Sequence, residues 1–222
     1  MIQYFLNNRG HMTVQDLFFL VLSYTVIVLV ILPFHEFAHA WVAHKCGDDT
    51  ARWNGRLTLN PLKHLDPLGT ALIVLCGFGY ARPVPVITRN FRNYKRDMIL
   101  VALAGPLSNL LLAAVSVGLF ALSLTFVREY QTLLWLKMIF IDILMSVNIT
   151  LAVFNMLPIP PLDGSRLWST LLPPRVAYAL ERNSRVFTIV LFALLVVGVL
   201  DGPLYWLSDG IARLLFTVFG LN

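Results

Sequence analysis

The chain has 222 residues, of which 58% are apolar and only 13% are charged. Soluble domains are about 45–50% apolar and about 25% charged, so a soluble chain of this size could not cover its surface with so few charges. The mean hydropathy of +0.73 supports an integral membrane protein. The net charge of +5 does not indicate nucleic-acid binding, because the basic residues lie in separate clusters between apolar segments.

Four apolar segments are long enough to cross a bilayer, which takes about 20 residues of helix. They are residues 17–34 with a helical extension to about 43, 98–127, 138–157, and 186–200 with a continuation to about 206. The sequence therefore predicts an all-α polytopic membrane protein with four to five transmembrane helices in a single domain over 1–222.

The segment 67–81 is uncharged but only 15 residues long, and it contains three glycines. Runs of this length more often enter the bilayer and return than cross it. If it does not cross, and the first helix runs inward, thirteen basic residues lie inside and four lie outside. If it does cross, the division is seven inside and ten outside. Because basic residues favour the cytoplasmic side, we expect a re-entrant segment.

The first apolar helix contains the sequence His35-Glu36-Phe37-Ala38-His39. His35 and His39 are one helical turn apart, so both imidazoles can reach one metal ion. Glu36 lies beside them, where it can take a proton from a metal-bound water. A chance match is disfavoured because an unpaired carboxylate in a membrane helix costs about 2.5 kcal/mol or more.

A catalytic zinc needs a third protein ligand and an open position. Glu129 lies on the outer side in this topology, and Glu181 lies in a charged, water-exposed stretch. Asp163 follows the helix over 138–157, which ends on the inner side, and a Pro-rich turn there can fold back to the metal. The alternative for Asp163 is an ordinary Asp-Gly turn with Gly164.

The histidine motif and Asn155-Met156-Leu157-Pro158-Ile159-Pro160-Pro161-Leu162-Asp163-Gly164 together resemble the site-2 protease family of intramembrane zinc metalloproteases. Ala104-Gly105-Pro106-Leu107-Ser108-Asn109 resembles the signature of that family's next core helix. Gly55-Arg56-Leu57-Thr58-Leu59-Asn60-Pro61 resembles its compact prokaryotic members, which lack extra domains. The resemblance covers most of residues 30–170. The last 40 residues contain no motif that resembles the family.

The resemblance implies that His35, His39 and Asp163 bind one Zn²⁺ per chain, that Glu36 is the general base, and that Asn155 positions substrate or steadies the oxyanion. It implies an endopeptidase that hydrolyses peptide bonds within or next to transmembrane segments of membrane-anchored proteins, in regulated intramembrane proteolysis. We expect a multi-pass protein of a prokaryotic cell membrane, with its active site toward the cytoplasm. The catalytic core would span about 17–170, followed by C-terminal helices over 186–219.

Two other functions remain open. A catalytically inactive relative would bind transmembrane helices as a scaffold, but it would need neither an intact ligand set nor Glu36. A channel or transporter would need a polar pathway through the bilayer, whereas the charges here gather at one depth.

Several polar residues outside the motifs carry weaker expectations. The alternation over 56–60 predicts a short strand near the zinc site, which either captures substrate by strand addition or caps the site. Asn109 and Asn148 are either catalytic accessories or helix–helix hydrogen-bonding residues, and we favour the second role. We expect Asp142 to be paired or to reach the membrane surface, and His64 to be solvated.

Overall fold

The structure is a computed structural model that describes residues 14–76 and 79–221. Within these residues every regular element is a helix, and no strand is present. Three apolar helices are long enough to cross a membrane, with 29, 33 and 26 residues. The first, Leu17–Lys45, is formed by α2 (Val14–Val26), the π-helix η1 (Ile27–Ile31) and α3 (Leu32–Lys45). The second is α6 (Tyr94–Phe126). The third, Tyr130–Asn155, is formed by α7 (Tyr130–Lys137), the π-helix η4 (Met138–Met145) and α8 (Ser146–Asn155).

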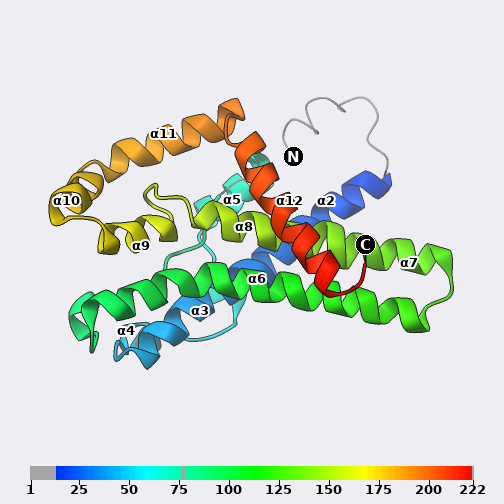
Figure 1. The fold of residues 1–222 in the computed structure, drawn as a ribbon, viewed down its shortest axis with the longest axis horizontal. Helices are drawn as coiled ribbons and strands as arrows, with labels where there is room; N and C mark the ends of the chain where they lie inside the picture. Colours follow the sequence, from blue (N-terminus) through cyan, green and yellow to red (C-terminus); the bar gives the residue numbers. More distant parts are fainter. Residues whose placement is uncertain (1–13, 77–78, 222) are drawn as a thin grey trace.

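The long helix α6 runs along most of the length of the molecule (Figure 1), and it contacts α3, η4, α8 and α9 (Asp163–Leu171). An apolar core joins α6 to the third long helix and to α12 (Asp201–Val218). Its buried members are Ala113, Val117, Ile141, Met145 and Ile149, and Ile211 and Leu215 of α12 pack against them. Because apolar side chains gain nothing by leaving lipid for each other, this packing depends on close fit rather than on the hydrophobic effect.

The C-terminal part of the chain does not continue as one helix to residue 206, so the sequence expectation was wrong there. Gly198 has a φ of 78°, a left-handed conformation that glycine adopts easily, and it ends α11 (Ser184–Val197). The chain then bends by 82° into α12. The two helices together are long and apolar enough for one broken span, which brings the possible spans among the described residues to three or four. The short helix α10 (Pro174–Arg182) precedes α11.

The described residues on either side of the segment 67–81 lie close together. Its helix α5 (Pro67–Cys76) has 10 residues, or about 15 Å, which is half of a bilayer core of about 30 Å. The backbone N–H of Arg82 donates to the carbonyl of His64 at 2.8 Å, so the two ends of the segment meet. A Cβ on Gly69 would lie only 2.0 Å from the carbonyl oxygen of Tyr80, so the returning chain passes directly against α5.

The short strand expected over 56–60 does not form, and this segment is irregular. The neighbouring chain contains Pro83 and Pro85, which have no N–H to donate to a ladder. The contact is made instead by the buried side chain of Arg56, whose Nη2 donates to the carbonyls of Arg82 and Pro83. A side-chain anchor therefore replaces the predicted backbone pairing.

The expectation that His64 is solvated was also wrong, because its side chain is fully buried. Its Nε2 lies 2.7 Å from the carbonyl oxygen of Thr58 and so ties together the loop that includes η2 (Pro61–Lys63). The remaining short elements of this side of the molecule are α4 (Thr50–Trp53) and η3 (Thr88–Asn90).

Candidate metal centre

His35 and His39 lie on the same face of α3, as their spacing of four residues predicts. Their rings meet edge to face with centroids 4.7 Å apart, and the two Nε2 atoms are 3.1 Å apart. Each residue is only 6% exposed. The two imidazoles therefore present their Nε2 atoms to one point inside the bundle.

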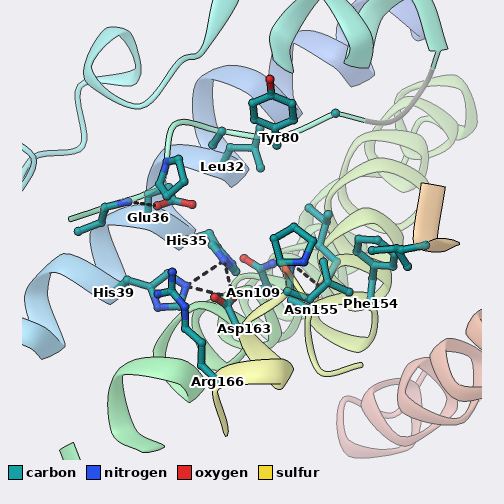
Figure 2. A pocket seen from close by; sticks show the side chains of 18 of the residues that line it. Leu32, His35, Glu36, His39, Tyr80, Asn109, Phe154, Asn155, Asp163 and Arg166 are labelled. Atoms are coloured by element: carbon teal, nitrogen blue, oxygen red, sulfur yellow. Dashed lines mark hydrogen bonds and ion pairs between the residues drawn. The ribbon is translucent and has the colours of Figure 1, made fainter. Parts of the chain in front are cut away.

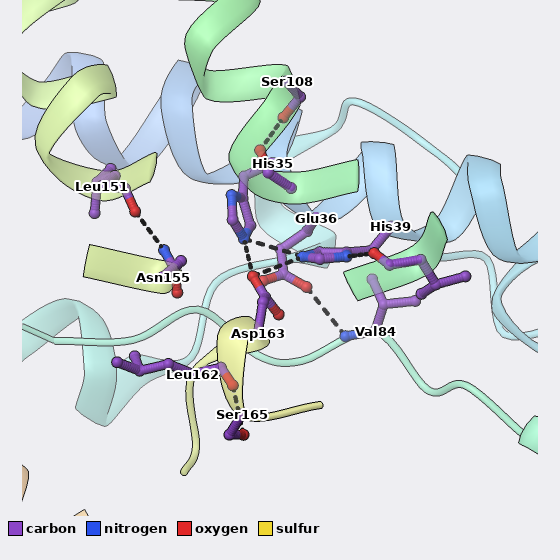
Figure 3. Close-up of polar contacts among 12 residues, drawn as sticks. His35, Glu36, His39, Val84, Ser108, Leu151, Asn155, Leu162, Asp163 and Ser165 are labelled. Atoms are coloured by element: carbon purple, nitrogen blue, oxygen red, sulfur yellow. Dashed lines mark hydrogen bonds and ion pairs between the residues drawn. The ribbon is translucent and has the colours of Figure 1, made fainter. Parts of the chain in front are cut away.

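Asp163 reaches the same point from the other end of the fold. It is the first residue of α9, directly after the Pro-rich turn, and its Oδ2 lies 3.1 Å from Nε2 of His35 and 3.1 Å from Nε2 of His39. Figure 3 shows the three side chains converging. Gly164 permits this approach, because a Cβ there would lie 2.3 Å from the carbonyl oxygen of Met156. Asp163 therefore joins the histidines, as the sequence predicted.

The spacing of these three atoms fits a zinc ion. Two ligands on a tetrahedral zinc, each about 2.0 Å from the metal, lie about 3.3 Å apart. The three mutual separations of 3.1 Å are close to that value. Among the described residues, His35, His39 and Asp163 are the group of three that could hold a metal ion.

The hydrogen bond of His39 supports a cation at this point. Its Nδ1 lies 2.7 Å from the carbonyl oxygen of Val101, which can only accept, so Nδ1 carries the proton. Nε2 of the neutral ring then directs a lone pair at the Oδ2 of Asp163, which is also an acceptor. Two acceptors at 3.1 Å repel unless a proton or a metal ion lies between them. A carbonyl partner on the far nitrogen is also the usual support of a metal-bound histidine.

Gly105 of α6 packs against the rings of both histidines. A Cβ on Gly105 would lie 2.3 Å from Nε2 of His39 and 2.4 Å from Cε1 of His35. Real Cβ contacts are never this short, so only glycine lets α6 pack against the metal-facing edges of the rings. The motif containing Gly105 was visible in the sequence, but its contact with the histidines was not.

Glu36 lies beside the two histidines and lines the same cavity. Its Oε2 accepts a hydrogen bond from the backbone N–H of Val84 at 3.1 Å (Figure 3). Val84 belongs to the segment that Arg56 holds through the carbonyls of Arg82 and Pro83. This support for Glu36 was not predicted, because nothing in the sequence indicates which segment crosses above α3.

A cavity of about 450 Å³ opens over the three converging side chains, and its walls are mainly apolar (Figure 2). It is lined by α3, α6, α8, α9, α11 and the segment 79–86. Asn155 lines it too, although its Nδ2 donates to the carbonyl of Leu151, one turn earlier in its own helix, at 3.0 Å. Leu191 and Leu195 of α11 are further lining residues, so the C-terminal region forms part of the site.

The other acidic candidates lie outside this cavity lining. Asp142 forms an exposed ion pair with Lys137 at 3.0 Å, which confirms the expectation that it is paired. Glu129 is exposed and accepts from the hydroxyl of Thr132, and Glu181 is exposed on α10. Neither belongs to the group of potential metal ligands.

Comparison with known proteins places the chain in a family. The sequence model of Peptidase family M50 matches residues 135–198. A Bacillus subtilis protein named "Putative zinc metalloprotease YwhC" is 41% identical over 206 residues, which cover 90% of this chain and 94% of that protein. The chain belongs to peptidase family M50, the site-2 protease family. The resemblance found in the sequence motifs is therefore confirmed.

Relatives of lower identity extend the similarity to other genera. "Putative zinc metalloprotease Rip2" of Mycolicibacterium smegmatis is 32% identical over 204 residues, covering 85% of this chain and 76% of that protein. "Putative zinc metalloprotease MJ0611" of Methanocaldococcus jannaschii is 32% identical over 156 residues, covering 66% and 73%. No solved structure matches the chain. Membership of family M50 supports a zinc metalloprotease.

Proposed function

We propose that this protein is an intramembrane zinc endopeptidase, which hydrolyses peptide bonds within or next to the transmembrane segments of membrane-anchored proteins. The observation that carries the proposal is the mutual 3.1 Å spacing of His35, His39 and Asp163 inside an apolar helix bundle. Glu36 beside them supplies a proton acceptor. This combination is what hydrolysis of an amide needs and what a helix-binding scaffold does not need.

His35, His39 and Asp163 would hold one zinc ion per chain. When bound, zinc would polarise the scissile carbonyl and lower the pKa of a water molecule to about 7. Glu36 accepts the proton of the attacking water and delivers it to the amine as the C–N bond breaks. The N–H of Val84 fixes one oxygen of that carboxylate, so the other oxygen is available for the proton.

Asn155 is proposed to position the substrate backbone. Its helix holds one of its amide hydrogens through Leu151, which fixes the orientation of the side chain at the cavity wall. The Oδ1 atom and the second amide hydrogen would then contact an unwound peptide in the cavity. A transmembrane substrate must unwind locally, because its amides are otherwise occupied by helical hydrogen bonds.

The site is proposed to lie toward the cytoplasmic side of a prokaryotic cell membrane. His35 is ten residues before the end of its helix at Lys45, or about 15 Å. The excess of basic residues in the loops at this end supports an inner location. The meeting of His64 with Arg82 supports a re-entrant 67–81. Water and the hydrolysed products would then exchange with the cytoplasm.

Metal removal tests this proposal. Purified wild type in detergent should cleave a single-span peptide that has a helix-breaking Asn-Gly pair in its inner half and a fluorophore–quencher pair at its ends. A chelator should abolish cleavage, and Zn²⁺ but not Mg²⁺ should restore it, because two histidines and one carboxylate suit zinc. Binding of the peptide without cleavage in the zinc-loaded protein would instead indicate the scaffold function.

A further inference from the structure

Asn109 of α6 is buried in the wall of the cavity over the histidines, and it has no hydrogen bond to any other described residue. It has no exposed surface, and both its Nδ2 and its Oδ1 lack a partner among the described residues. It lines the cavity together with His35, Glu36 and Asp163. Figure 2 shows it between His35 and Asn155.

The two other asparagines of the long described helices behave differently. Asn148 is equally buried, and its Oδ1 also lacks a partner among the described residues, but its Nδ2 donates to the carbonyl of Leu144 at 2.8 Å. Asn155 donates to Leu151 at 3.0 Å. Buried polar groups are nearly always hydrogen-bonded, and the exceptions gather where a ligand or a reaction supplies the partner. Asn109 is such an exception. Because it lines the cavity, a substrate bound there could supply its hydrogen-bond partner.

The position of Asn109 on α6 follows from that of Gly105. Residues four apart lie on one face of a helix, so Asn109 is one turn beyond the glycine that contacts His35 and His39. The same face of α6 therefore contacts the histidine rings at Gly105 and, one turn later, carries the side-chain amide of Asn109, which has no partner among the described residues. A neutral amide can also be buried in an apolar helix at lower cost than a lysine or arginine.

We propose that Asn109 is a further catalytic residue, whose Nδ2–H donates to the scissile carbonyl oxygen as that oxygen gains negative charge. The proposal rests on the proposed function, because it assigns a donor within that same reaction. Asn109 forms and breaks no covalent bond. A donor that is already oriented in a dry site stabilises the transition state more than the substrate, so it acts on kcat.

The competing explanation is that Asn109 only supports His35, whose Nδ1 is also buried without a partner among the described residues. A bridging water between the two would then fix the ring. That role predicts weaker zinc binding in an Asn109 variant, whereas a donor to the substrate predicts unchanged zinc binding.

The test compares Asn109→Ala with wild type and with Asn148→Ala, a control at a buried asparagine outside the cavity. The measurements are zinc affinity by chelator competition, the thermal midpoint, and kcat and KM for the single-span fluorogenic peptide. For Asn109→Ala we expect unchanged zinc affinity, an unchanged or higher midpoint, a kcat lower by about 100-fold, and a KM within about twofold. Asn148→Ala should keep kcat within about twofold.

Two additions keep the result decisive. Asn109→Leu fills the space with an apolar side chain and should show the same loss of kcat even if Asn109→Ala is poorly folded. In a Glu36→Gln background, Asn109→Ala should leave the affinity for the uncleaved peptide unchanged. A kcat within threefold of wild type, weakened zinc binding, or an effect on KM alone would overturn the role of Asn109. Absence of zinc-dependent cleavage by wild type would overturn the proposed function itself, and this role with it.

Discussion

The position that a Cβ atom would take on Gly105 lies 2.3 Å from Nε2 of His39. The backbone of α6 therefore packs directly against the metal-facing edge of the histidine. Any side chain at this position must displace either the rings or the helix, and both changes separate His35 and His39 from Asp163.

We predict that Gly105→Ala weakens zinc binding by at least about 10-fold, as displacement of a ligand's supporting shell usually does. Chelator competition on the purified protein measures this effect. Gly210→Ala is the matched control, because no atom of the described residues lies within 4 Å of a Cβ at that position of α12. Gly210→Ala should leave zinc binding unchanged. An equal loss of zinc binding in both variants would refute the role of the contact between Gly105 and the histidines.

Asp163→Ala should remove most of the bound zinc and all peptide cleavage, because a site with two histidines alone lacks its charged ligand. Atomic absorption of the purified variant measures the zinc content. Asp142→Ala removes a carboxylate that pairs with Lys137 in an exposed position away from the histidines, so it should retain a full zinc complement. Full zinc in Asp163→Ala would mean that the third ligand lies elsewhere.

Asp48 should stabilise the fold in a pH-dependent manner. Burial alone would raise its pKa, but hydrogen bonds from Thr50, Asn90 and the N–H of Ile87 outweigh burial and hold the pKa below its ordinary value. Its contribution is therefore fully present above the unfolded pKa of about 3.9 and is lost as the pH falls through the lower folded pKa.

Asp48→Asn should accordingly lower the free energy of unfolding by about 1–3 kcal/mol near neutral pH, and the difference from wild type should shrink below about pH 4. Thermal midpoints in detergent between pH 3 and pH 7 measure it. Asp49→Asn is the control, since Asp49 is partly exposed and pairs with His44. A difference that stays constant over this pH range would contradict the role of the Asp48 carboxylate.

The proposed topology can be tested with single cysteines in a background that lacks Cys46 and Cys76. Arg89 and Arg128 are exposed and lie near opposite ends of α6. An impermeant thiol reagent should label Arg89→Cys only from the cytoplasmic side and Arg128→Cys only from the outside. Labelling of both from one side would show that the assignment of the loops is wrong.

The sequence was most informative where chemistry depends on local spacing. His35 and His39 converge because residues four apart share a helix face, and this holds in any fold that keeps α3 helical. Asp163 could be placed from topology, because the charge distribution brought the end of the helix over 138–157 to the inner side. In the structure, Oδ2 of Asp163 lies 3.1 Å from Nε2 of each histidine.

The sequence was less informative where a contact depends on packing between segments. The alternation over 56–60 indicated a strand, but Pro83 and Pro85 in the chain beside it leave no ladder for a strand to join. The burial of His64 and the bond from Val84 to Glu36 both depend on how the segment after α5 returns. Asn109 was interpreted as a residue for helix packing, but the described helices give its amide no partner.

The central claim is that Glu36 is the proton acceptor of a zinc-dependent hydrolysis, and its most direct test is the rate of cleavage of the single-span fluorogenic peptide by zinc-loaded Glu36→Gln. Glutamine keeps the size of the side chain but cannot accept the proton, so zinc content should equal that of wild type while cleavage falls to background. Glu181→Gln, the same substitution at an exposed position on α10, should cleave at the wild-type rate. Cleavage by zinc-loaded Glu36→Gln at a rate near that of wild type would contradict the claim.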